Sequence, residues 1–119
     1  MTPAVRREAG MVTAEIAVAL PALVLVLTLG LGAVGAVTDH LRCVDAARTG
    51  ARLLARGEPV EEVRREVARQ SPEGARIALA VGPGSVQVDV STDLPTVLSA
   101  LGVRGRPRGV AHAVPEAAP

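Results

Sequence analysis

The sequence of 119 residues contains no phenylalanine, tyrosine or tryptophan. Aromatic side chains usually supply much of the buried area of a water-soluble core, and they form the surfaces on which single-stranded nucleic acids stack. Their absence therefore weakens the case for an independently stable globule and for a nucleic-acid partner. The chain also lacks the tryptophan and tyrosine belts that mark the interfaces of many membrane proteins.

Lysine is absent too, so all 13 basic residues are arginine, and they nearly balance the 12 acidic residues. A net charge of +1 gives no electrostatic argument for a nucleic-acid partner, which would need a clustered basic surface. The single cysteine, Cys43, excludes an intramolecular disulfide and a multi-cysteine zinc site. His40 and His112 have no second ligand at a useful spacing, so we expect no metal and no other cofactor.

Charge is missing altogether from residues 16–37, a run of 22 residues. At about 1.5 Å per residue a helix over this run would be about 33 Å long, close to the hydrocarbon thickness of about 30 Å. A buried helix of a soluble protein would need a large partner core on all sides, which the rest of the chain cannot supply. The run therefore predicts one membrane-spanning helix.

An amphipathic helical pattern continues beyond the apolar run. Gly57 followed by Pro59 predicts the end of this long helix, because glycine favours the C-terminal cap and proline cannot continue the helix. The apolar positions expected on its buried face are Leu41, Val44, Ala47, Ala51 and Leu54.

The remaining residues predict a small α+β head. A second helix is expected over residues 59–70, and alternating apolar residues at 75–81 and 85–91 predict a β-hairpin across Gly82-Pro83-Gly84. Residues 93–103 suggest a short helix or an apolar loop, and residues 110–114 a third strand. The expected fold is a long N-terminal transmembrane helix that continues into a head with a second helix and a two- to three-stranded antiparallel sheet.

The most informative motif is AGMVTAE, residues 9–15, directly before the apolar run. A carboxylate at the mouth of a membrane span is costly unless it is paired or hydrated, so Glu15 is either a boundary residue in the headgroup layer or a functional group. The segment resembles the cleavage region of type IV prepilins in three features together: a short basic leader, a Gly at its end and a Glu five residues later.

This resemblance implies that a prepilin peptidase cuts between Gly10 and Met11. Glu15 would then be the assembly carboxylate that pairs with a neighbouring subunit's new amine, and Pro21 would be the proline that bends the stem. Met11 stands where many pilins have phenylalanine. An apolar bundle tolerates such a carboxylate when an ammonium group compensates its charge.

Residues 7–58 more narrowly resemble TadE-like proteins of actinobacteria, which are minor pilins or pseudopilins of the Tad (Flp) pilus. The implied division is a leader over 1–10, a transmembrane helix over 11–37, its amphipathic continuation over 38–57 and an extracytoplasmic head over 58–119. The implied partners are the membrane, the prepilin peptidase, other pilin-like subunits and the pilus assembly machinery. The implied location is the cell membrane, with a cytoplasmic N-terminus, and the pilus at the cell surface.

Three glycines in the apolar run fit the pattern of a dinucleotide-binding loop, Gly30-x-Gly32-x-x-Gly35. The context excludes this function, because no strand precedes the motif and no βαβ unit surrounds it. Gly32 and Ala36 instead form a small-xxx-small pair, which favours contact with another helix.

No sequence motif of a catalytic site is present: there is no G-x-S-x-G, no H-E-x-x-H and no P-loop. We therefore expect a protein that is not an enzyme and has no small-molecule substrate. The positive-inside rule gives conflicting signals, since Arg6 and Arg7 precede the span and four arginines follow it between residues 42 and 56. The prepilin resemblance favours the cytoplasmic N-terminus.

Two other classes of protein stay open at this point. A conventional signal peptide could be cut after Ala36, which would release a secreted binding protein, although the apolar run exceeds the usual 7–15-residue core. An uncleaved anchor would instead make an extracytoplasmic accessory protein of an envelope complex.

Overall fold

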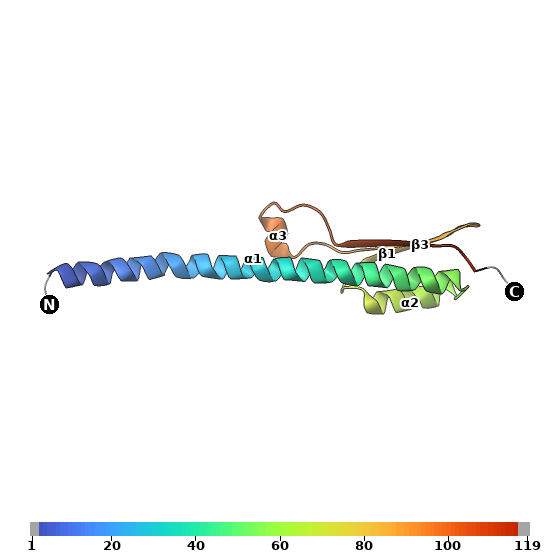
Figure 1. The fold of residues 1–119 in the computed structure, drawn as a ribbon, viewed down its shortest axis with the longest axis horizontal. Helices are drawn as coiled ribbons and strands as arrows, with labels where there is room; N and C mark the ends of the chain where they lie inside the picture. The colour runs from blue at the N-terminus through green and yellow to red at the C-terminus, as the bar shows by residue number, and fades with distance from the viewer. Residues whose placement is uncertain (1–2, 117–119) are drawn as a thin grey trace.

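The computed structural model of the chain describes residues 3–116, so the first two residues of the expected leader and the last three of the expected head lie outside it. The molecule is a rod of 92 × 21 × 18 Å with all its strands at one end (Figure 1). Its elements are α1 (Pro3–Ala55), α2 (Val60–Gln70), β1 (Arg76–Val81), β2 (Val86–Ser91), α3 (Thr96–Ala100) and β3 (Arg108–Ala113). The predicted α+β, pilin-like fold is confirmed.

Helix α1 is one unbroken helix of 53 residues that serves both as the protruding rod and as the central element of the head. It ends at Ala55, and Gly57 caps it as the sequence predicts, with a φ of 84° that is accessible to glycine at little cost. The N–H of Gly57 donates to Leu54 and that of Glu58 to Leu53, at 3.0 and 3.1 Å. These two bonds form a Schellman cap that satisfies carbonyls of the last turn.

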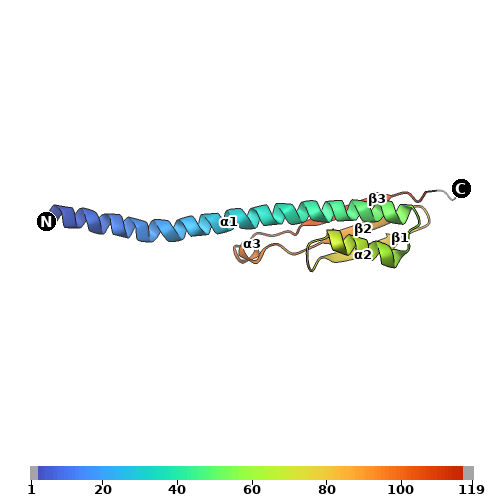
Figure 2. The same ribbon diagram turned by 90° about the horizontal axis from the view of Figure 1, so that it is seen from below.

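Helix α2 begins directly after Pro59 and turns back along α1 (Figure 2). Glu61 and Glu62 in its first turn interact favourably with the helix dipole. Its two fully buried side chains, Val63 and Val67, are one turn apart and therefore lie on one face. The helix is held to the head by this narrow apolar stripe.

The three strands form an antiparallel sheet in the order β1-β2-β3. The predicted hairpin is confirmed, and Val81 pairs with Val86 across its turn. The apolar positions pair across the strands as expected, because Ile77 lies opposite Val90 and Leu79 opposite Val88. The third strand begins at residue 108, two residues before the predicted start, and pairs along the whole of β2.

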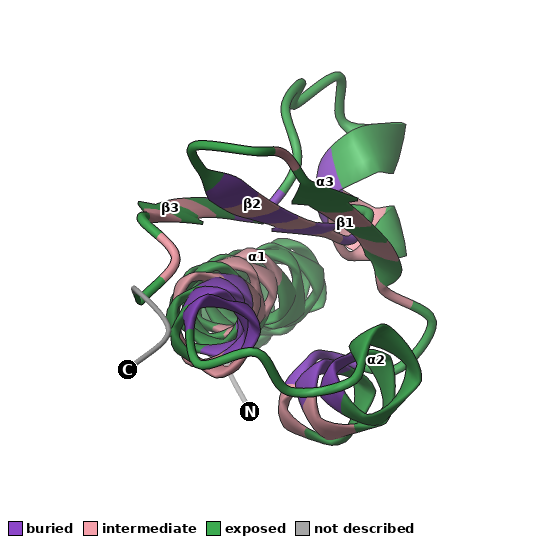
Figure 3. Ribbon diagram, turned by 90° about the vertical axis from the view of Figure 1, so that its right-hand side faces the viewer, coloured by how far each residue is buried: buried purple, intermediate pink, exposed green. Residues whose placement is uncertain are grey.

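The head has two layers, with α1 and α2 side by side on one face of the sheet (Figure 3). The buried face of α1 consists mainly of small residues, and Gly50 lies between the two layers. A Cβ at Gly50 would stand 2.6 Å from Val67 of α2 and 3.2 Å from Val88 of β2. The buried side chains of α1 belong to Cys43, Ala46, Ala47, Ala51, Leu54 and Ala55.

One predicted position on this face was wrong. Leu41 is 57% exposed, whereas Cys43 is fully buried. The sheet approaches the backbone of α1 so closely that only small side chains fit between them, which moves the buried face toward the alanines and away from the larger leucine.

The segment that joins β2 to β3 leaves the head and runs back along α1 toward its N-terminus (Figures 1 and 2). It carries α3, whose buried residue Leu98 packs beside the rod. Residues 93–103 thus form a short helix flanked by loops, and they lie nearer to the apolar half of α1 than any other part of the head.

Candidate functional site

The N-terminal half of α1 exposes apolar side chains in all directions. This segment belongs to a single helix that is long and apolar enough to cross a membrane, and only 6% of its most apolar stretch is buried. Such a surface is unstable in water, since burying apolar area yields about 25 cal/mol per Å². The geometry is that of a single-pass membrane segment. Its exposed large side chains include Ile16, Val18, Leu20, Leu23, Val24, Leu25, Val26, Leu27, Leu31 and Val34.

Polar hydroxyls within this segment are satisfied inside the helix. Thr13, Thr28 and Thr38 each donate to the carbonyl four residues earlier, at 2.9, 2.7 and 2.9 Å. A hydroxyl bonded in this way does not need water, so the threonines are compatible with a lipid environment.

The residues of the prepilin-like motif all lie on α1 and face outward. Met11 is 71% exposed, Glu15 is exposed, and a Cβ at Gly10 would meet no atom within 4 Å. Within residues 3–116, the side-chain carboxylate of Glu15 has no hydrogen bond or ion pair. The carboxylate is thus available to a group outside the chain.

Pro21 lies inside α1, where it removes one backbone donor. The helix continues through it, and Figure 2 shows a shallow curve in this N-terminal half rather than a break. The rod therefore stays a single element from the motif to the head.

Gly32 lies on the side of α1 that faces α3 of the same chain, and Ala36 lines a cleft beside the loop that follows α3. A Cβ at Gly32 would be 2.8 Å from Val97 and 3.4 Å from Leu98, and one at Gly35 would be 3.8 Å from Pro95. Small residues here allow α3 to approach the rod. Contact of this surface with a helix of another subunit stays a prediction.

A cleft of about 260 Å³ separates α1 from the loop that follows α3. Ala36, Val37 and His40 line one wall, and the loop with Arg104 and Arg106 lines the other. His40 accepts a hydrogen bond from the backbone N–H of Arg108 at 3.3 Å, so it ties the start of β3 to α1. The cleft lies where the uncharged run of α1 ends.

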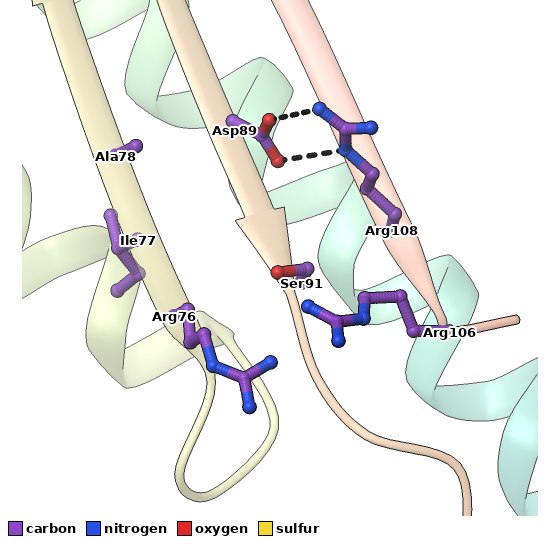
Figure 4. Close-up of a pocket in the computed structure, with 7 residues that line it drawn as sticks. All are labelled: Arg76, Ile77, Ala78, Asp89, Ser91, Arg106 and Arg108. Atoms are coloured by element: carbon purple, nitrogen blue, oxygen red, sulfur yellow. Dashed lines mark hydrogen bonds and ion pairs between the residues drawn. The ribbon is translucent and has the colours of Figure 1, made fainter.

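The outer face of the sheet carries a second hollow, of about 320 Å³, lined by three arginines and one acid (Figure 4). Asp89 accepts hydrogen bonds from both the Nε and the Nη2 of Arg108, the first at 3.1 Å. These bonds hold the pKa of Asp89 below its ordinary value of 3.8 despite partial burial. Arg76 pairs with Asp93 at 3.3 Å, outside the hollow.

Cys43 is fully buried in the head, a role its sequence context did not indicate. Its thiol lies 3.9 Å from the carbonyl oxygen of Pro107. Burial raises the pKa of Cys43, the negative charge of Asp39 adds to the rise, and Arg42 opposes it. The described residues 3–116 contain no group of three or more possible metal ligands.

The chain is similar to a protein of Mycobacterium tuberculosis (strain ATCC 25618 / H37Rv) named "Apoptosis inhibitor Rv3655c". The two are 38% identical over 98 residues, which cover 82% of this chain and 77% of the relative. The chain belongs to the family of this mycobacterial protein. No family model matches the chain, and no solved structure matches it significantly.

Proposed function

We propose that the chain is a structural and assembly component, of the minor-pilin type, of a Tad-type type IV pilus. The observation that carries the proposal is the unbroken α1. Its N-terminal half is exposed and apolar, with Glu15 directly before the uncharged run, and its C-terminal half is packed in a small head. Such a rod can pass from a bilayer into a bundle of similar helices without refolding, because both surroundings cover its apolar surface. The function is non-catalytic.

In this mechanism a prepilin peptidase cuts between Gly10 and Met11, and the apolar helix stays attached to the head. The new amine of one subunit pairs with Glu15 of its neighbour. A carboxylate in an apolar bundle is strongly destabilising alone, so the pair is favourable only when the two groups meet. The pairing therefore sets how far one helix is shifted along the next.

The proposed topology places the N-terminus in the cytoplasm and the head outside the membrane. The partners are the prepilin peptidase, other pilin-like subunits and the assembly machinery. The head then caps the filament, primes its assembly or adapts it to the secretion machine.

A secreted or anchored extracytoplasmic binding protein is the alternative, and inhibition of apoptosis, stated in the name of the relative, would belong to this class. The packing of α3 disfavours release by a cut after Ala36. Such a cut would remove Gly32, against which Val97 and Leu98 pack, and would expose the buried Leu98.

The mature N-terminus distinguishes these functions. The full chain is expressed with a prepilin peptidase, and its N-terminal peptide is identified by mass spectrometry. A start at Met11 supports the pilin function, a start at Val37 the secreted protein and a start at Met1 the permanent anchor. Gly10→Val should abolish the cut at Met11.

The role of the carboxylate is tested by Glu15→Ala in the organism that assembles the pilus. We expect normal membrane insertion and impaired filament assembly, counted by electron microscopy. Glu8→Ala is the matched control, because it removes a carboxylate that is cut away with the leader. Unchanged piliation in Glu15→Ala would contradict the assigned role.

A further inference from the structure

We infer that the loop from Leu94 to Arg106 is a phospholipid-binding wedge, which inserts α3 into the head-side leaflet and places Arg104 and Arg106 among anionic headgroups. The inference requires only that α1 spans a membrane and is independent of the pilus. It adds a second membrane contact to a chain with a single spanning helix.

The first argument is depth. Val97 and Leu98 pack on Gly32, which lies five residues inside the end of the uncharged run at Val37. Five residues of helix correspond to about 7.5 Å. Since the run, about 33 Å long, nearly equals the hydrocarbon thickness of about 30 Å, α3 is carried below the headgroup layer whenever α1 spans the membrane.

The second argument is composition. Residues 94–103 carry no charged side chain, although Asp93 precedes them and Arg104 follows them. Leu101 is 55% exposed and Val103 47% exposed, at the tip of the segment. Exposed apolar side chains at a loop tip favour an apolar solvent, which at this depth is the acyl region of the lipid.

The third argument is the backbone. The N–H groups of residues 98, 99, 101, 102 and 103 all donate within the segment, and the hydroxyl of Ser99 donates to Thr96 at 3.0 Å. Backbone groups that enter lipid must be satisfied internally, because no water replaces a missing bond. Five backbone N–H groups of this segment already meet this requirement.

The fourth argument is charge. Within residues 3–116 neither Arg104 nor Arg106 has an ion-pair partner, whereas the arginines Arg76 and Arg108 of the sheet are paired. Both free arginines line the cleft beside Val37 and His40, at the end of the uncharged run. Guanidinium groups at this level complement lipid phosphates.

The absence of aromatic residues permits a direct test. Leu101→Trp introduces the chain's only indole fluorophore, and the full, uncleaved variant is reconstituted into vesicles of phosphatidylcholine and phosphatidylglycerol with brominated acyl chains. We expect blue-shifted emission that the bromines quench. Val81→Trp, at a position that is 61% exposed at the opposite end of the sheet, is the matched control and should emit as in water, unquenched.

The headgroup contact is tested by brominating either lipid alone at the same mole fraction. Brominated phosphatidylglycerol should quench the Leu101→Trp variant more strongly, since each arginine near an anionic surface strengthens its attraction to that surface about fivefold. When Arg104→Gln and Arg106→Gln are added to this variant, the two lipids should quench equally. Adding Arg65→Gln on α2 instead should preserve the difference.

Three results would overturn the inference. The Leu101→Trp variant could emit at the same long wavelength as the Val81→Trp variant, which would place α3 in water. Blue-shifted emission without quenching would mean that another protein copy covers the loop. Equal quenching of the Leu101→Trp variant by both lipids, with both arginines in place, would refute the headgroup contact. No pilus component is present in these vesicles, so failure here leaves the proposed pilus function untouched.

Discussion

Gly109 of β3 lies directly against the backbone of Cys43 of α1. A Cβ at Gly109 would stand 2.4 Å from the carbonyl oxygen of Cys43 and 2.5 Å from the Cα of Val44. No side chain fits between the strand and the helix at this point. The missing side chain is what allows the sheet to lie flat on the face of small residues of α1.

Gly109→Ala should therefore destabilise the head by about 1–3 kcal/mol, the usual cost of an overpacked contact. The atoms in the way are backbone and cannot rotate aside. The measurement is urea unfolding of the full chain in detergent micelles, followed by the circular dichroism of the sheet. Gly84→Ala in the hairpin turn, where a Cβ would meet nothing within 4 Å, should be close to neutral. Equal midpoints for the two variants would contradict the close packing.

The Asp89–Arg108 pair should make the head sensitive to acid. Because the folded-state pKa of Asp89 lies below its ordinary value of 3.8, the stabilisation is complete above that pH and is lost as the pH falls through the folded pKa. The pair is partly exposed, so the loss should be at most about 1 kcal/mol. Asp89→Asn should lower the urea midpoint at pH 6 and should make the midpoint decrease less steeply below pH 4. Asp93→Asn, which breaks a more exposed pair, should change the midpoint less.

The Cys43 thiol should be inert while the head is folded. It is fully buried, and its raised pKa leaves less of the reactive thiolate at neutral pH. We expect alkylation by iodoacetamide at pH 8 to be more than about tenfold slower in the folded chain than in urea. Cys43→Ala combined with Leu41→Cys moves the thiol to an exposed position and should react rapidly in both states. Fast alkylation of folded Cys43 would refute its burial.

Gly32→Ile should displace α3 from the rod. A Cβ alone would already lie 2.8 Å from Val97, so a branched side chain forces the two segments apart. The expected result is faster hydrogen exchange at the amides of residues 98–103, measured by mass spectrometry in micelles. Gly30→Ile is the control, because a Cβ there meets nothing within 4 Å. Hydrogen exchange at residues 98–103 in this variant should match that of the parent chain.

The hairpin and the end of α1 could be predicted from the sequence because local residues determine them. Alternation of apolar residues fixes which sides of β1 and β2 face the core, and Gly57 provides the positive φ that a Schellman cap requires. Neither feature depends on distant parts of the chain.

The helix–sheet contact could not be predicted in the same way. Leu41 is the larger apolar residue, yet Cys43 and the alanines face the core, because the spacing of the two layers decides which side chains fit. Gly109 interrupts the apolar pattern and delays the predicted start of β3, although close approach to α1 requires glycine there. The placement of α3 beside Gly32 likewise arises only from tertiary packing.

The continuity of α1 from Pro3 to Ala55 also has a mechanical consequence. With no hinge between rod and head, the head cannot change its orientation independently of the span. Transmembrane helices tilt by about 20° on average, and they tilt further when the bilayer is thinner than their apolar length. The direction in which the head points, and so the surface that it offers to its neighbours, is therefore governed by the thickness of the surrounding membrane.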